Sequence, residues 1–174
     1  MRGIFISPPD VTVNTNINKQ GIYMLKIDFK PLSPEAKMPA LATKHSAGFD
    51  LSASVACTVH PGETVMVQTG LAVAIPVGYV GMICPRSGLA KKNGITVTNA
   101  PGIIDADYRG ELCVLLHNTS NTTFAVSIGD RIAQMVFTSV PTSLELCLVA
   151  ELDETDRGTS GFGSSGVSAD AVAG

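Results

Sequence analysis

The sequence has no tryptophan, only 5% aromatic residues, and a charged fraction of just 16% over 174 residues. A core with so few aromatic rings has to be built from small aliphatic side chains. The 12 basic and 15 acidic residues leave a formal net charge of -3, so the chain lacks the broad basic field that attracts a nucleic-acid backbone. We therefore expect no nucleic-acid partner.

Clustered metal or redox ligands are also missing. The cysteines form no CxxC pair and no basic-then-apolar leader opens the chain, so we interpret them as reduced, mostly buried thiols. The histidines do not combine with them into the ligand spacing of a zinc site. We expect a reducing compartment, the cytoplasm or, for a viral protein, the host-cell interior. The residues concerned are Cys57, Cys84, Cys113, Cys147, His45, His60 and His117.

A membrane-spanning helix is absent as well. Residues 64–85 carry no formal charge and are long enough to cross a bilayer. Gly70, Pro76, Gly78 and Gly81 interrupt this stretch, a punctuation that favours short strands and turns. We expect no membrane association.

What the sequence does contain is a series of short segments rich in Val, Ile, Leu and Thr, separated by turn residues. Most alternate apolar and polar positions with a period of two, as strands with one buried face do. The pattern predicts an all-β fold, a sandwich, barrel or jelly roll, with one short helix that Ser87 caps and Gly94 ends. The predicted strands cover residues 25–29, 50–53, 65–68, 71–74, 79–84, 95–98, 111–118, 124–126, 131–138 and 144–149.

Composition also divides the chain into three parts. Residues 1–23 are polar, and we expect a flexible N-terminal extension there or a segment upstream of a start at Met24. Residues 24–150 would form the β domain. Residues 151–174 begin with an acidic stretch and continue as a Gly/Ser-rich arm, which cannot pack a core of its own.

Three segments carry groups suited to chemistry. Residues 99–111 (NAPGIIDADYRGE) lie between two predicted strands, so a hairpin there either exposes backbone groups that read a planar base or is a solvated turn. Arg86 and Ser87 at the predicted helix start would bind an anion, unless Ser87 is only a cap. The arm from Arg157 (RGTSGFGSSG) combines glycines and hydroxyls that suit phosphate oxygens with Phe162, which suits stacking on a ring, although such tails are also found as plain disorder.

In all five of its motifs, taken in order, the sequence resembles the trimeric dUTPase family. The resemblance covers about residues 25–166, and five ordered motifs are a specific signal. It implies a jelly-roll-like β-barrel assembled as a homotrimer with active sites shared between subunits. The five segments are residues 47–53 (AGFDLSA), 85–90 (PRSGLA), 94–111, 129–134 (GDRIAQ) and 157–166.

The resemblance implies Mg²⁺-assisted hydrolysis of dUTP to dUMP and pyrophosphate, which limits uracil incorporation into DNA and supplies dUMP for dTMP synthesis. Asp105 would be the general base that activates water for attack on the α-phosphorus. Tyr108 would pack on the deoxyribose where a 2′-hydroxyl would clash. Asn99 and the backbone near Gly102 and Ile104 would read uracil.

The same resemblance implies how the phosphates and the metal are held. Asp50 would act near the magnesium through its water shell. Phe162 would stack on the base when the arm closes, and Arg157 would reach the terminal phosphate. The phosphate-binding residues would be Arg86, Ser87, Gly88, Gln134, Arg157, Gly163 and Ser164.

Two other functions are compatible with the same fold. One is a dCTP deaminase or a bifunctional deaminase-dUTPase. Enzymes of this kind need a glutamate-centred deamination site, and they lack the hairpin sequence found here. A dUTPase-like binding or regulatory protein would engage a partner at the site. Intact Asp105, Tyr108 and Phe162 favour an active enzyme over the second alternative.

Overall fold

The structure, a computed structural model, describes residues 15–17 and 23–160. Apart from one short helix, its regular elements are β-strands, which confirms the predicted all-β class. The elements are β1 (Thr15–Ile17), β2 (Tyr23–Leu25), β3 (Asp28–Pro31), β4 (Ala40–Leu41), β5 (Phe49–Ser52), β6 (Cys57–Val59), β7 (Thr64–Ala74), β8 (Tyr79–Cys84), α1 (Ser87–Asn93), β9 (Ile95–Val97), β10 (Gly102–Ile104), β11 (Glu111–Asn118), β12 (Phe124–Val126) and β13 (Arg131–Ser139).

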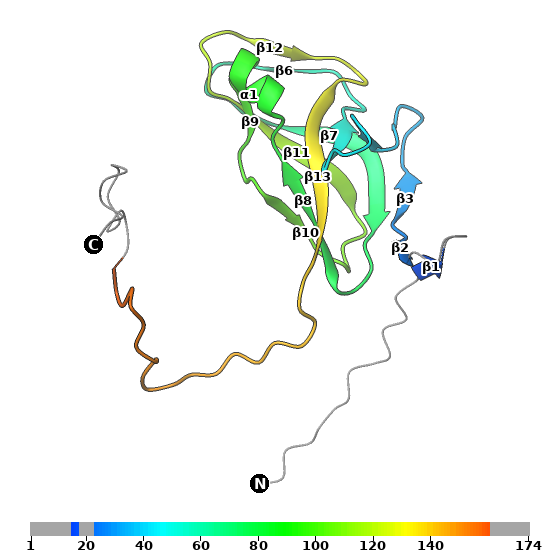
Figure 1. The fold of residues 1–174 in the computed structure, drawn as a ribbon. Coiled ribbons are helices and arrows are strands. Elements are labelled where there is room, and N and C mark those ends of the chain that lie inside the picture. Colours follow the sequence, from blue (N-terminus) through cyan, green and yellow to red (C-terminus); the bar gives the residue numbers. More distant parts are fainter. Residues whose placement is uncertain (1–14, 18–22, 161–174) are drawn as a thin grey trace. The chain divides into compact units, whose positions relative to one another are not determined.

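Two antiparallel sheets form the body of the fold (Figure 1). One sheet has the strand order β10-β8-β13-β5-β4, and the other has the order β3-β7-β11-β9. The pairs β12-β6 and β1-β2 form small two-stranded sheets. Neighbours in the sheets are mostly distant in sequence, as the long connections of a jelly roll require.

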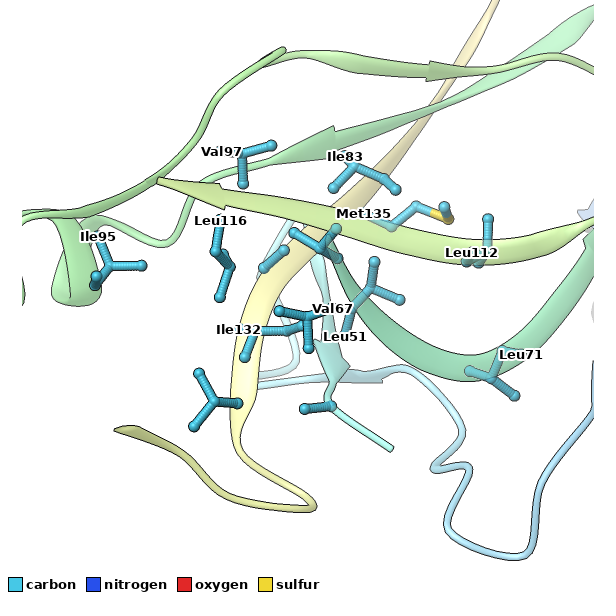
Figure 2. Close-up of a cluster of buried hydrophobic side chains, with 14 of the residues drawn as sticks. Leu51, Val67, Leu71, Ile83, Ile95, Val97, Leu112, Leu116, Ile132 and Met135 are labelled. Carbon is cyan, nitrogen blue, oxygen red and sulfur yellow. The ribbon is translucent and has the colours of Figure 1, made fainter. Parts of the chain in front are cut away.

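Small aliphatic side chains from both sheets fill the core (Figure 2). Leu51 on β5 and Met135 on β13 share it with Val67 on β7 and Leu116 on β11, all with exposed fractions of 0%. This confirms the aliphatic core expected from the aromatic content. Along β11 buried and half-buried residues alternate without a break, as its sequence pattern predicts.

The strand β7 is one continuous strand, whereas the sequence pattern predicted two strands interrupted at residues 69 and 70. Gly70 has φ of +68° within it, and the register with β11 shifts between Glu111 and Cys113. A glycine at such an irregularity bends a strand without ending it. No helix in residues 15–17 and 23–160 is long and apolar enough to cross a membrane.

The helix has the predicted bounds but not the predicted cap. Within the described chain, the N-cap residue is Arg86, with φ of -91° and ψ of 123°, and no side chain forms a cap hydrogen bond. The serine cap at Ser87 was therefore wrong, because Ser87 already lies inside the first turn. Gly94 ends the helix as predicted, with φ of 65° and its N–H bonded to the carbonyl of Ala90.

The strand predicted over residues 144–149 is wrong. The described residues from Ser143 to Ser160 contain no strand, and the side chains of Leu146 and Leu148 are 95% and 104% exposed. The alternation of leucines is present, but a strand also needs a paired edge. Contacts divide the chain into a unit of residues Met1–Thr142 and a second unit of residues Ser143–Gly174.

The cysteines are free but less buried than expected. Cys57, Cys84 and Cys113 are half-buried, and Cys147 is exposed. Burial, reinforced by the charge of Glu63, raises the pKa of the Cys57 thiol above its usual value of 9.0. Burial raises the pKa of the Cys113 thiol in the same way, with a smaller contribution from the charge of Glu111.

Two consequences of these raised pKa values can be measured. Iodoacetamide at about pH 8 should modify exposed Cys147 well before Cys57 and Cys113, because the thiolate is the reactive form. The two thiols whose pKa is raised favour the folded state at a pH below their unfolded pKa. This contribution to stability is lost as the pH rises through their folded pKa. Mass spectrometry of the alkylated peptides checks the first point, and equal rates at the three sites would contradict it.

Candidate functional site

Three segments that are far apart in sequence meet in one row of the five-stranded sheet. In the register of β13, Gln134 lies opposite Asp50 on β5 and opposite Cys84 on β8. Arg86 follows two residues after Cys84, at the junction of β8 and α1. Strand pairing therefore brings Asp50, Arg86 and Gln134, which come from three different motifs, close together.

Asp50 connects two arginines. Its Oδ1 accepts a hydrogen bond from Nε of Arg86 at 2.9 Å, and its Oδ2 accepts one from Nη1 of Arg131 at 3.0 Å. The Asp50 side chain is only 11% exposed, against 25% for Arg86 and 55% for Arg131. Two guanidinium groups around one carboxylate leave an excess of positive charge, which favours an anion such as phosphate.

Of Asp50 and the two arginines that it binds, Arg131 is the residue that sequence reasoning did not single out. Its carbonyl oxygen also accepts a hydrogen bond from Nη1 of Arg86 at 2.9 Å, so its backbone and its side chain both stabilise the site. The available signal was a basic residue three positions before Gln134 in the GDRIAQ segment. Only the sheet register shows that this residue reaches Asp50.

Gln134 braces the turn that carries Arg86. Its Nε2 donates to the carbonyl oxygen of Pro85 at 2.9 Å. A side chain on buried Gly48 would place its Cβ 2.4 Å from Oε1 of Gln134, so only glycine leaves room for the amide. This close contact explains why a glycine stands two residues before Asp50 in this segment.

Open space flanks the arginines. A hollow of about 330 Å³ is lined by Arg86, Leu89, Phe124 and Arg131 among others. A second, of about 300 Å³, is lined by Lys37, Asp50 and Arg131 among others. Ser87 and Gly88 are exposed in the first turn of α1, next to Arg86. An anion can therefore approach the guanidinium groups from solvent.

The connection between β9 and β11 is more elaborate than the predicted hairpin. The two strands do pair, with Leu116 opposite Val97. Within residues 98–110, however, β10 leaves this sheet and pairs with β8 in the other sheet, with Gly102 opposite Ile83. The segment is therefore held by both sheets, which makes it more rigid than a free hairpin tip.

The residues predicted to read a base lie at this connection. Gly102 is buried, and a Cβ there would lie 3.1 Å from Nδ2 of Asn99, so the two residues are in close contact. Ile104 is half-buried at the end of β10. The structure thus places Asn99, Gly102 and Ile104 together on one short segment that ends in β10.

Asp105 and Tyr108 follow directly after β10. The N–H of Tyr108 donates to the carbonyl of Asp105 at 3.2 Å, which closes a turn between them. Asp105 is exposed, and Tyr108 is 42% exposed with its Oη bonded to the backbone carbonyl of Glu111 at 2.9 Å. The carboxylate and the aromatic ring are therefore presented to solvent from one turn.

Within one chain, this turn does not meet the arginine pair. Ile104 is paired with Gly81 and the chain continues from it toward the start of β8, whereas Arg86 lies two residues past Cys84, at the other end of the strand. At about 3.3 Å per strand residue, the stretch from Gly81 to Cys84 alone spans about 10 Å. Figure 1 shows α1 at one end of β8 and the end of β10 toward the other. The arginine pair at Asp50 and the turn that carries Asp105 therefore lie apart within one chain.

Of the C-terminal arm, residues 151–174, the structure describes only residues 151–160. Arg157 lies in a turn of the second unit, where its Nε donates to the carbonyl of Ser160 at 3.1 Å. Phe162, Gly163 and Ser164 lie outside the described residues.

A two-sheet all-β fold with a carboxylate-braced arginine pair, and with a separate acid-tyrosine turn, defines a jelly-roll protein that binds a phosphorylated ligand. The dUTPase family model matches residues 34–166 of the chain. The chain therefore belongs to the dUTPase family.

The similar proteins agree with this family. The deoxyuridine 5'-triphosphate nucleotidohydrolase of Nautilia profundicola is 50% identical over 142 residues, which are 82% of this chain and 99% of that protein. The enzyme of the same name from Caulobacter vibrioides is 50% identical over 149 residues, 82% of this chain and 96% of that protein.

Solved structures show the same fold. A mutant dUTPase of Staphylococcus bacteriophage 80alpha with dUpNHpp has a TM-score of 0.77 and 31% identity, covering 83% of this chain and 100% of that one. A mutant dUTPase from phage phi11 of S. aureus, described with a structural Mg(II) ion, has a TM-score of 0.68 and 28% identity over 74% of this chain and 99% of that one.

Proposed function

We propose that this chain hydrolyses dUTP to dUMP and pyrophosphate. Its relatives are named for the hydrolysis of deoxyuridine 5'-triphosphate. The observation that supports this most directly is the arginine pair braced by Asp50, which offers a triphosphate two positive groups beside open space. Phosphoryl chemistry depends mainly on positioning and on charge stabilisation, and both are available here. The chain is in this account a dUTP diphosphatase.

A substrate panel tests the proposal. We expect pyrophosphate release from dUTP at a much higher kcat/KM than from dTTP, dCTP or UTP. Rejection of cytosine would rest on backbone donors and acceptors near Gly102 and Ile104 that would otherwise be left unpaired. Ammonia release from dCTP would indicate the deaminase alternative, and nucleotide binding without turnover would indicate the binding-protein alternative.

Asp105 is the residue to which we assign the general base. Its carboxylate is exposed at the turn directly after β10, where a water molecule can reach it. A base within hydrogen-bond distance of the attacking water withdraws its proton as the bond to the α-phosphorus forms. Tyr108 stands three residues away with its ring open to solvent, in a place suited to pack on the sugar.

Magnesium is the ion we assign to the reaction. Mg²⁺ keeps several waters and is commonly held by one or two carboxylates together with substrate phosphates. Among residues 15–17 and 23–160, no three His, Cys, Asp or Glu side chains gather to hold a metal by themselves. Both oxygens of Asp50 already accept hydrogen bonds from arginines. The residues therefore fit an ion carried by the triphosphate, with Asp50 reached through water, and do not fit a protein-only cage. When bound, Mg²⁺ would neutralise phosphate charge.

We propose a homotrimer with shared sites, which the separation described above supports. Asp105 and Arg86 have to act on one triphosphate, but they lie at opposite ends of β8, more than about 10 Å apart at about 3.3 Å per strand residue. A second copy that supplies one of the two groups removes this conflict. Sedimentation equilibrium should give three chains per particle, and mixing Asp105→Asn with Arg86→Ala chains should restore part of the activity lost by each.

The arm would complete the site from outside the core. Arg157 would reach the terminal phosphate, Gly163 and Ser164 would donate to phosphate oxygens, and Phe162 would stack on uracil. Such closure excludes water other than the nucleophile and strengthens the charge interactions around the phosphates.

Substitution of Asp50 should weaken the phosphate site without abolishing it. Asp50→Ala removes the acceptor of both arginines, so Arg86 loses its fixed orientation and the local positive charge rises. We expect a loss of about 10- to 100-fold in kcat/KM. Asp28→Ala is the matched control, because Asp28 also pairs with a cation, Lys26 at 2.8 Å, and lines neither hollow beside the arginines. Steady-state kinetics on both variants decides the matter, and equal losses would remove Asp50 from the site.

A further inference from the structure

Glu111 is the residue at which the connection of residues 98–110 rejoins the four-stranded sheet. Its half-buried carboxylate accepts two hydrogen bonds from β7. The N–H of Gly70 donates to Oε1 at 2.8 Å, and Nε2 of Gln68 donates to Oε2 at 3.0 Å. Hydrogen bonds to a charged acceptor are the stronger kind, so this end of the connection is tied firmly to β7.

The receiving side of this tie is itself fixed. Gly70 has φ of +68°, its carbonyl accepts a hydrogen bond from the N–H of Leu32 at 2.7 Å, and a Cβ there would lie 2.5 Å from Oγ of Ser33. Only glycine fits such a place. The register shift between Glu111 and Cys113 leaves the Gly70 N–H free for the carboxylate.

Glu111 also holds the ring of Tyr108. The hydroxyl Oη of Tyr108 donates to the backbone carbonyl of Glu111 at 2.9 Å. The ring lies against Gly110, where a Cβ would be 2.4 Å from Oη and 2.6 Å from Cζ. With 42% of the residue exposed, the tyrosine is held at its hydroxyl end and against the backbone while it stays open to a ligand.

We infer that Glu111 is a positioning residue that fixes Tyr108 and thereby sets the discrimination between deoxyribose and ribose. The inference rests on the proposed function, in which Tyr108 packs on the sugar. A steric wall rejects a 2′-hydroxyl only if it cannot retreat, and the two hydrogen bonds to β7 are what prevent its retreat. Glu111 itself touches neither the sugar nor the phosphates in this account.

The test compares kcat/KM for dUTP and for UTP in three variants. Glu111→Ala should lower the dUTP:UTP ratio about tenfold, because steric discrimination of this kind is worth about 10–200-fold in total. Glu111→Gln should keep the ratio within about threefold of the native value, since its amide oxygen still accepts from Gly70 and Gln68 can reorient its own amide. Glu63→Ala is the matched control, because Glu63 also accepts a backbone N–H through its side chain, from His60, in a different turn.

A fourth variant covers the case in which Glu111→Ala does not fold. Gly110→Ala leaves the Glu111 carboxylate in place and pushes directly on the Tyr108 ring. It should lower the dUTP:UTP ratio as well, and hydrogen exchange at Gly70 should accelerate in Glu111→Ala but not in Gly110→Ala. An unchanged ratio in every folded variant, or an equal fall in Glu63→Ala, overturns the inference. A native chain that releases no pyrophosphate from dUTP instead overturns the proposed function, whatever Glu111 does.

Discussion

Asp105→Asn is expected to bind dUTP with nearly native affinity and to lose turnover by about 10²–10⁴-fold, the contribution typical of a general base. Asparagine has almost the same shape as aspartate, so the turn closed by the N–H of Tyr108 and the carbonyl at position 105 should persist. What the amide cannot do is take a proton from water. Because the group acts on the nucleophile and not on the bound nucleotide, kcat should fall while the dissociation constant stays.

The same turn supplies the control. Asp107 is an exposed carboxylate two residues further along, so Asp107→Asn removes the same charge from the same loop. It should retain nearly native kcat. Calorimetry with a non-hydrolysable dUTP analogue and single-turnover pyrophosphate release from dUTP separate binding from chemistry in both variants. Full activity in Asp105→Asn, or an equal loss in Asp107→Asn, would show that position 105 is not the base.

Local pattern predicted most of the strands, for a reason that β11 illustrates. Its residues are mostly apolar, and buried and half-buried positions alternate along it, so that one face packs on the core. Residues 144–149 have a similar alternation but form no strand among the described residues of the second unit. Alternation reports a chain able to pair, and pairing needs an edge that the sequence does not identify.

Part of the membership of the site was predictable from the sequence, and its connections were not. Asp50, Arg86 and Gln134 could be selected as motif residues, but the ion pairs from Asp50 to Arg86 and Arg131 depend on the register of β5, β8 and β13. Register is a long-range property, set by how the buried faces of separate strands match. Sequence reasoning therefore assigned no catalytic or binding role to Glu111 or to Arg131. It also missed that β10 crosses to the other sheet.

Deletion of residues 157–174 is expected to leave a folded protein whose kcat falls by about 10²–10³-fold, as loss of transition-state charge stabilisation does. Among the residues that the structure describes, the buried core all precedes residue 136, so we expect the fold to persist without the deleted segment. The segment carries Arg157 and the hydroxyls and glycines that we assign to the phosphates. Contacts made mainly on closure act on the transition state, so KM should change less than kcat.

The matched control is a chain that ends at Gly166, which lacks only the residues beyond the fifth motif. It should retain nearly native kinetics, whereas Arg157→Ala in the full chain should show part of the loss. Thermal unfolding and sedimentation of each variant, measured beside kcat, separate a missing catalytic contact from a damaged assembly. If the 157–174 deletion kept its native rate, closure by the arm would be no part of catalysis, and the arginine pair at Asp50 would have to stabilise the triphosphate unaided.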